Sequence, residues 1–243
     1  MTPEHNLIDS VQEQVRRLSH AVLDLLFPPR CVVCHRPGSH LCADCLAVLP
    51  TLSGPLCPVC ALPVEAPGIC PRCAARRPSF TRVRSGYVYE GAVRRAVLAF
   101  KYNGRRALAA PLVDALSAVL PPPSPLPDAL CAVPMHHLRE QERGYNHAKL
   151  LADELGRCWG VRVLPGEALR RTQPTTRQVG LSYQARQSNV KGAFEAERRF
   201  VEGKVLVVVD DVCTTGATLD ACAMALLRAG AAAVEGVTLA RAL

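Results

Sequence analysis

The sequence predicts an α/β fold, in which helices flank a largely parallel sheet, with a small cysteine-rich domain at the N-terminal end. Three observations predict it. Apolar strand-like segments alternate with helix-like segments from residue 80 onward, which is typical of a parallel sheet. Four Cys-x-x-Cys pairs lie within residues 31–73. Five apolar residues, VLVVV at 205–209, lead directly into Asp210 and Asp211, as a buried strand would at the edge of a ligand crevice.

The length and charge of the chain narrow the class of protein. The 243 residues suit one α/β domain with a small appendage. The net charge of +8 and the pI near 9.0 fit a phosphate-rich partner, whether a nucleotide, a sugar phosphate or a nucleic acid. Apolar stretches stay far below the ~20 residues of a membrane span, and the polar N-terminus MTPEHNLIDS lacks the features of a signal peptide. We therefore expect a cytoplasmic protein without membrane insertion. Its oligomeric state is left open.

The chain divides into three parts by composition. Residues 1–27 carry one apolar stripe at helical spacing, which predicts an amphipathic helix that ends before Pro28 and Pro29. This helix is expected to pack on the rest of the protein or on a second subunit. A membrane-surface role is disfavoured because the polar face mixes charges of both signs. Residues 28–78 form the cysteine-rich domain and residues 79–243 the α/β domain.

The four Cys-x-x-Cys pairs predict two metal sites. Each pair places two sulfurs on one tight turn, and two such turns complete a tetrahedral Cys₄ site for zinc. In a reducing compartment this spacing favours metal over disulfides. Since the cysteines of this chain supply all four ligands of each zinc and leave no position open for water, the sites are expected to be structural. A crossed pairing of the four Cys-x-x-Cys pairs stays open. The simplest pairing follows chain order, with one zinc bound by Cys31, Cys34, Cys42 and Cys45, and the other by Cys57, Cys60, Cys70 and Cys73.

The elements of the α/β domain follow one another along the chain. Two helices at 92–101 and 107–120 flank Asn103 and Gly104, and the last helix follows the small residues after Asp211. The polar stretch at 171–190 is expected to be a loop. Strands are expected at 87–89, 129–134, 161–169, 204–209 and 232–240, and the remaining helices at 145–158 and 217–229.

The stretch after the apolar run has the properties of a phosphate and ribose site. Small residues and Gly216 let backbone N–H groups approach a ligand, and the loop begins a helix, where anions bind well. Two acids can hold the vicinal hydroxyls of a ribose. Simple capping of the helix would explain one threonine but not two acids after five apolar residues. Cys213 is interpreted as a small apolar residue, with a reactive thiol as the alternative. The predicted site comprises Asp210, Asp211, Val212, Cys213, Thr214, Thr215, Gly216, Ala217 and Thr218.

A second candidate segment follows the strand expected at 129–134. Arginine can hold phosphate oxygens through two hydrogen bonds, so this basic segment is a candidate phosphate site. The alternative is a solvated basic loop. The segment includes Pro134, Met135, His136, Arg139 and Arg143.

These segments together resemble a known family. VLVVVDDVCTTGAT at 205–218 resembles the phosphoribosyl-pyrophosphate (PRPP) motif of type I phosphoribosyltransferases. The blocks AVPMHHLREQERGYNHAKLLADELG (132–156) and RQVGLSYQARQSNVKGAF (177–194) are similar to the ComF family of competence-associated proteins, which also carry an N-terminal zinc ribbon. The resemblance covers nearly all of residues 28–243. It implies a type I phosphoribosyltransferase fold with a double zinc ribbon, and a lid loop that includes Gln178, Ser182, Arg186 and Asn189. It also implies that the basic segment with Pro134, Met135, His136, Arg139 and Arg143 binds pyrophosphate. Lys101 matches a further feature of the family and is a candidate for contact with pyrophosphate or a second substrate, with no such role as the alternative.

The resemblance also implies an activity. The expected reaction is Mg²⁺-dependent transfer of a phosphoribosyl group from PRPP with release of pyrophosphate, in a protein of competence and DNA uptake. Asp210, Asp211 and Arg143 are the expected catalytic residues. The alternative is a non-catalytic module that binds PRPP or single-stranded DNA and acts with an ATP-driven DNA translocase. Aromatic residues make up only 5 % of the chain, so a base-stacking platform is poorly supported. The acceptor substrate is not predicted.

Overall fold

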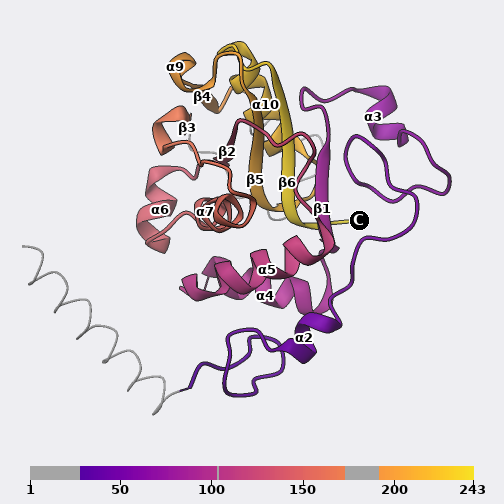
Figure 1. Ribbon diagram of the computed structural model, residues 1–243, viewed down its shortest axis with the longest axis vertical. Helices are drawn as coiled ribbons and strands as arrows, with labels where there is room; N and C mark the ends of the chain where they lie inside the picture. The colour runs from indigo at the N-terminus through magenta and orange to yellow at the C-terminus, as the bar shows by residue number, and fades with distance from the viewer. Residues whose placement is uncertain (1–27, 103, 173–191) are drawn as a thin grey trace, which may run out of the picture. The chain divides into compact units, whose positions relative to one another are not determined.

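A computed structural model describes residues 28–102, 104–172 and 192–243 of the chain (Figure 1). The described residues fall into two compact units, which divide between Ala47 and Val48. The predicted N-terminal helix and the predicted lid residues lie outside the described residues. The three-part division of the sequence at residues 27 and 78 stays a prediction.

A four-stranded parallel sheet forms the centre of the larger unit. Its order is β1 (Val83–Val88), β6 (Ala233–Arg241), β5 (Val205–Cys213) and β2 (Ala129–Ala132). The predicted parallel sheet is therefore confirmed. Strand β5 runs four residues beyond the predicted end at 209, so both aspartates lie within the last part of the strand rather than after it.

Helices cover both faces of this sheet (Figure 1). Helices α5 (Ala109–Val119) and α7 (His147–Trp159) pack on one face, and α10 (Ala217–Arg228) packs on the other. Strand residues alternate between the two faces, as the period of two requires. Leu206 and Val208 of β5 join the core that contains α10.

Irregular chain runs along both edges of the sheet. At β1, the N–H groups of Val83 and Val88 donate to the carbonyls of Val59 and Pro50. At β2, Leu130 donates to the carbonyl of Arg162 and accepts from the N–H of Leu164. The predicted strand at 161–169 is wrong, because this stretch makes a single bridge to β2. Pro165 and the 3₁₀ helix η2 (Gly166–Ala168) then turn the chain away, since proline cannot continue a hydrogen-bonded ladder.

Several shorter elements complete the larger unit. Helix α4 (Gly91–Tyr102) and the 3₁₀ helix η1 (Arg106–Leu108) precede α5. Helix α6 (His137–Arg143) occupies the segment expected to be a basic loop. Strands β3 (Leu169–Arg171) and β4 (Phe194–Ala196) pair antiparallel, and α9 (Arg198–Val201) leads into β5. The cysteine-rich segments each hold one short helix, α2 (Ala43–Ala47) in the smaller unit and α3 (Pro71–Ala75) in the larger. None of the helices in the described parts of the chain is long and apolar enough to cross a membrane.

The tight contact at Gly156 generates a prediction about stability. A Cβ atom there would lie 2.7 Å from the carbonyl oxygen of Val161 and 2.7 Å from a methyl group of Val163. Alanine normally favours a helix over glycine by about 0.5–1 kcal/mol. Overpacking against backbone should reverse that sign, so Gly156→Ala should lower the free energy of unfolding by about 1–3 kcal/mol in urea titrations. The control is Gly166→Ala, where no atom lies within 4 Å. Equal stability of the two variants would contradict the packing described here.

Candidate functional site

Two adjacent acids that differ in their exposure to solvent lie near the C-terminal end of β5. Asp211 is 2 % exposed, while its neighbour Asp210 is partly exposed. The N–H of Asp211 donates to Oδ1 of Asp210 at 2.9 Å, so the two carboxylates belong to one cluster. Burial, together with repulsion from Asp211, raises the pKa of Asp210 to about 8. The pair therefore carries close to one negative charge at neutral pH.

A lysine and a histidine from two other helices hold Asp211. Nζ of Lys101, in the last turn of α4, lies 2.5 Å from Oδ2 of Asp211. Nε2 of His147, the first residue of α7, lies 3.7 Å from the same oxygen. Burial alone would raise the pKa of Asp211, but Lys101 and then His147 hold it down at about 2. Burial also lowers the pKa of His147 to about 4, so this ring is neutral at pH 7. Sequence reasoning missed His147 and did not anticipate that Lys101 pairs with an aspartate.

The segment after β5 forms the predicted loop. Gly216 has φ +80°, a left-handed conformation that glycine adopts readily, and α10 begins directly after it. The N–H of Ala217 donates to Oγ1 of Thr215 at 3.2 Å. The alternative of a reactive Cys213 is disfavoured, since this thiol is 2 % exposed and burial raises its pKa to about 11. We call residues 213–218 the phosphate loop from here on.

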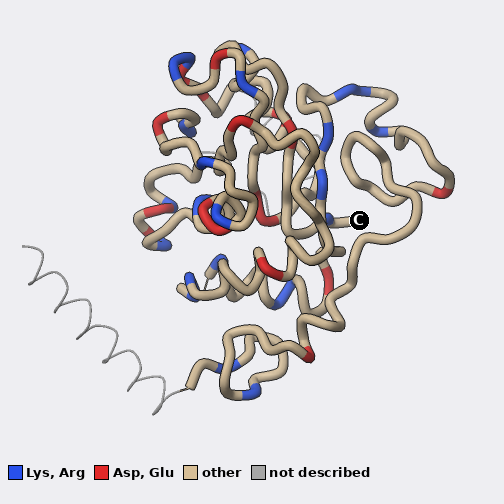
Figure 2. Tube along the Cα trace, viewed as in Figure 1, with Lys and Arg blue, Asp and Glu red and all other residues tan. Residues whose placement is uncertain are grey.

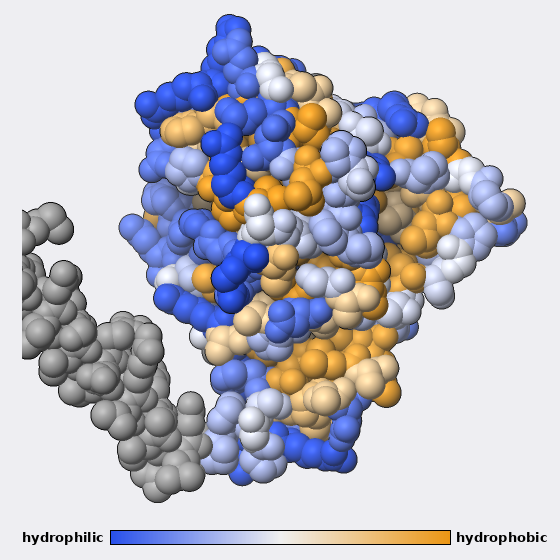
Figure 3. Space-filling model, viewed as in Figure 1, coloured by the Kyte–Doolittle hydropathy of each residue, from blue (hydrophilic) through white to orange (hydrophobic). Residues whose placement is uncertain are grey.

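The predicted pyrophosphate residues lie directly before α6 and within it. His136 is 6 % exposed and caps this helix, because its Nδ1 accepts the N–H of Leu138. Nη1 of Arg143 lies 3.4 Å from Nδ1 of His147, which brings this guanidinium close to the aspartate pair. The Arg143 guanidinium also lies over the ring of Tyr102, 4.7 Å from its centroid. The surface in the region of α6 and α7 is largely hydrophilic, as a charged ligand requires (Figure 3).

The structure describes the residues that border the predicted lid. The N–H of Thr172 donates to the carbonyl of Ala193 at 2.9 Å, just beyond the β3–β4 pair. Thr172 and Ala193 therefore lie side by side, next to the β3–β4 pair that packs on α10. Gln178, Ser182, Arg186 and Asn189 lie outside the described residues, and their role stays a prediction.

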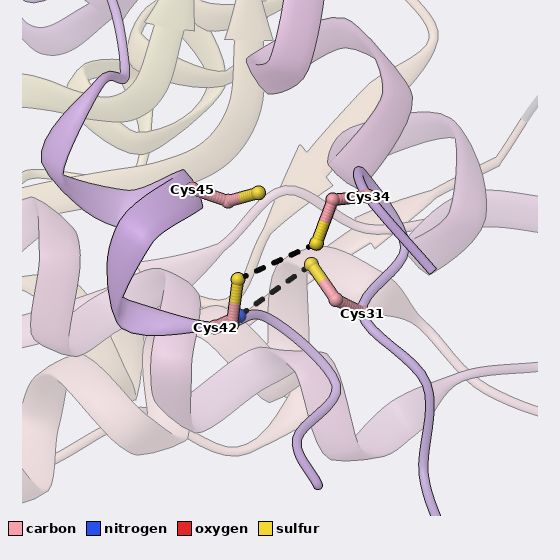
Figure 4. Close-up of side chains that lie close together, drawn as sticks. All are labelled: Cys31, Cys34, Cys42 and Cys45. Carbon is pink, nitrogen blue, oxygen red and sulfur yellow. Dashed lines mark hydrogen bonds between the residues drawn. The ribbon is translucent and has the colours of Figure 1, made fainter. Parts of the chain in front are cut away.

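The eight cysteines form two clusters in chain order, so the crossed pairing is excluded. Figure 4 shows Cys31, Cys34, Cys42 and Cys45 turned toward one another. The sulfurs of Cys34 and Cys42 lie 3.6 Å apart, and those of Cys60 and Cys70 also lie 3.6 Å apart. Zn–S bonds of about 2.3 Å at tetrahedral angles place sulfurs about 3.8 Å apart, whereas a disulfide needs about 2.05 Å. Both clusters therefore fit zinc.

The two clusters are built by the same local structure. The N–H of Cys42 donates to the sulfur of Cys31, and in the second cluster that of Cys70 donates to the sulfur of Cys57. His35 and Ala61, which follow the first Cys-x-x-Cys pair of each cluster, both adopt positive φ. The N–H groups of Cys42 and Cys70 stabilise the thiolate form of the sulfurs to which they donate, which favours metal binding at each site. The chain thus contains two copies of one ribbon, which we call the first ribbon (residues 30–45) and the second ribbon (residues 56–73).

Comparisons with known proteins agree with this architecture. The profile of a double zinc ribbon domain matches residues 22–74, and that of a phosphoribosyl transferase domain matches residues 142–243. The "DNA utilization protein YhgH" of Salmonella typhi is 35 % identical over 230 residues, which cover 90 % of this chain and 100 % of the relative. The chain belongs to the ComF family of competence-associated proteins. "Competence protein ComFC" of Bacillus subtilis, a further ComF relative, is 28 % identical over 85 % of this chain and 86 % of its own length.

Solved structures give a more distant likeness. A structural match with the glutamine PRPP amidotransferase of B. subtilis covers 56 % of this chain and 26 % of the amidotransferase chain, at 22 % sequence identity and a TM-score of 0.36. The parallel sheet, the phosphoribosyl transferase profile and the double ribbon together establish the predicted fold class on their own.

The first prediction from this site concerns metal content. Eight paired cysteines should hold about two zinc ions per chain, measured by native mass spectrometry of the purified ComF protein. Cys34→Ser and Cys60→Ser should each remove one ion, because they disrupt different clusters. Ser85→Ala serves as a control outside both ribbons and should retain both ions. One zinc in the wild-type protein would exclude the double-site assignment.

The second prediction concerns the proton on Asp210. Its pKa of about 8 in the folded state exceeds the usual value near 3.8, so the stabilising contribution of the protonated form is complete below pH 4 and declines as pH rises toward 8. Asp210→Asn imitates the neutral acid at every pH. Between pH 5.5 and 8, the unfolding free energy of wild type should fall relative to that of the variant, by at most about 1.4 kcal/mol per pH unit. Asp114→Asn, an exposed control, should show a flat difference. A flat difference for Asp210→Asn would mean that this acid is ionised throughout.

Proposed function

We propose that this ComF protein binds PRPP at the end of β5 and transfers the phosphoribosyl group to an acceptor, with release of pyrophosphate. One observation carries the proposal. A partly exposed acid, Asp210, stands beside an acid held by Lys101, directly before a loop of small residues at the start of α10. Carboxylates suit the two ribose hydroxyls, and the loop and helix start suit the 5-phosphate.

The two acids then have different tasks. Because Lys101 already occupies Oδ2 of Asp211, the carboxyl group that remains accessible to ribose hydroxyls is that of Asp210. Burial, and then the charge of Asp211, raise the pKa of Asp210 and keep it protonated at neutral pH, which allows Asp210 to donate as well as accept a hydrogen bond. Thr214, Thr215 and Thr218 are proposed to bring hydroxyl donors to the phosphate, beside the backbone N–H of Gly216, whereas the N–H of Ala217 already donates to Oγ1 of Thr215.

The leaving group would meet the basic residues around α6. In the proposed reaction the bond between C1 of the ribose and the pyrophosphate oxygen breaks, and pyrophosphate departs with the electron pair. The acceptor forms its bond to C1 through an oxocarbenium-like transition state and releases a proton. Arg143, whose guanidinium lies 3.4 Å from the His147 ring beside Asp211, is proposed to stabilise the departing charge. Arg139, His136, Met135 and Pro134 are proposed to line the pyrophosphate path.

Magnesium, which the family resemblance implies, does not fit the described residues as an ion held by the protein. His147, Asp210 and Asp211 place one ligand atom each within 4.8 Å of one another. However, the Lys101 ammonium lies 2.5 Å from Asp211, where it would repel a divalent cation. The reaction described above therefore uses no protein-held magnesium, and the ion is proposed to arrive as the counter-ion of the pyrophosphate.

The proposed biological setting is the use of DNA. The printed names of two relatives, a DNA utilization protein and a competence protein, support it. The second candidate function is a module that binds PRPP without transfer, and the observation that favours it is the Lys101–Asp211 ion pair, which leaves one accessible acid. A direct role in holding single-stranded DNA has less support. In the view of Figure 2, basic residues are scattered among acidic ones and do not form one continuous stripe.

The proposed site is tested by PRPP binding. The double variant Asp210→Asn with Asp211→Asn removes the carboxyl group proposed to hold the ribose hydroxyls together with the charged neighbour beside it, and its affinity for PRPP in isothermal titration calorimetry should fall by at least about tenfold. The control Asp114→Asn changes a distant exposed acid and should bind as wild type does. Unchanged binding by the double variant would refute the assignment of the site. Pyrophosphate release during a screen of bases and amines separates the two candidate functions, since the binding module would release none.

A further inference from the structure

The second ribbon is part of the same core as the phosphate loop. Its cysteines are buried together with Phe80 and Leu219, and Leu219 belongs to α10. The N–H of Ser79, which follows the ribbon, donates to Oδ1 of Asp220 in the first turn of α10 at 2.6 Å. The Phe80 ring lies 3.6 Å from the position that a Cβ atom on Gly216 would take. The ribbon and its following residues thus form a wall of the phosphate loop.

One buried guanidinium joins the ribbon to the loop through three of its four hydrogen bonds. Arg241, the last residue of β6, is 1 % exposed. Its Nε donates to the carbonyl of Cys60 at 3.0 Å, and its Nη1 donates to the carbonyl of Cys213 at 2.7 Å. Nη1 also donates to the carbonyls of Thr214 and Ala242. A single side chain therefore holds a ligand residue of the second cluster and the first two residues of the phosphate loop.

The charge of Arg241 calls for an anionic partner. A buried guanidinium is costly unless it is compensated, and Arg241 forms no ion pair with an Asp or Glu within residues 28–102, 104–172 and 192–243. Four thiolates with one Zn²⁺ carry a net charge of −2. Arg241 contacts the backbone of Cys60, one of these four ligands. A metal-loaded second cluster would therefore supply negative charge next to this guanidinium, which contacts it through the Cys60 carbonyl.

We infer that Arg241 is a positioning residue through which the metal-loaded second ribbon holds the phosphate loop in its binding conformation. The inference concerns the second ribbon, which lies in the same compact unit as the phosphate loop. Loss of metal from the second cluster would free the Cys60 carbonyl and deprive Arg241 of its counter-charge, so the carbonyls of Cys213 and Thr214 would lose their common donor. The consequence for PRPP affinity rests on the function proposed above, whereas the consequence for the loop itself does not.

Hydrogen exchange of the full-length protein tests the inference at the loop. In Arg241→Met, the amides of residues 213–217 should exchange at least about tenfold faster than in wild type, while those of β2 stay unchanged. Arg241→Lys should restore part of the protection, because it returns the charge and one donor. The matched control is Arg228→Met, an exposed arginine at the far end of α10, which should leave the loop unchanged. Wild-type exchange in the loop of Arg241→Met would overturn the inference.

A second comparison addresses the metal and does not depend on Arg241 variants. Cys73→Ser and Cys45→Ser alter equivalent ligands of the two clusters. Cys73→Ser should speed loop exchange, and Cys45→Ser should not. Equal loop exchange in these two variants would overturn the inference, even if Arg241→Met fails to fold. PRPP affinity is measured on the same samples. A wild-type protein that does not bind PRPP refutes the proposed function, but the exchange results still decide the role of Arg241.

Discussion

The ion pair between Lys101 and Asp211 is the interaction on which the arrangement of the site depends. Two adjacent carboxylates at the buried end of a strand repel each other, and burial opposes the ionisation of both. The ammonium group lets one acid stay charged, and the proton on Asp210 removes the second charge. Helix α4 must therefore end beside β5, which brings its last turn and the start of α7 to the same place. The charges of Asp210 and Asp211 thus account for the meeting of α4, α7 and β5, which are far apart in the sequence.

The sheet and the ribbons could be predicted because their signals are local. Five apolar residues before Asp210 indicated the central strand, and the repeated Cys-x-x-Cys spacing indicated the clusters. The strand expected at 161–169 is wrong because Pro165 ends the pairing with β2. Helix α6 was missed although Leu, Arg, Glu and Gln are strong helix formers. Its basic residues had been interpreted as a phosphate-binding segment, with a solvated loop as the alternative.

The partners of the site residues could not be predicted because they are contacts between distant segments. Nothing in the residues around Lys101 indicates that it meets Asp211, and His147 looks like an ordinary first residue of a helix. Arg241 lies near the end of an apolar strand, where a charged residue would be expected to reach solvent. Its burial becomes intelligible only when the carbonyls of Cys60 and Cys213 are seen to converge on it.

The covered edges of the sheet restrict how this ComF protein can associate with other molecules. An open strand edge offers unpaired N–H and C=O groups to which another extended chain can add. Here residues 50–59 occupy the edge at β1, and residues 162–164 occupy the edge at β2. Strand addition at the central sheet is therefore blocked on both sides, which guards against sheet-to-sheet aggregation. A protein partner must instead recognise helices, loops or ribbons through their side chains.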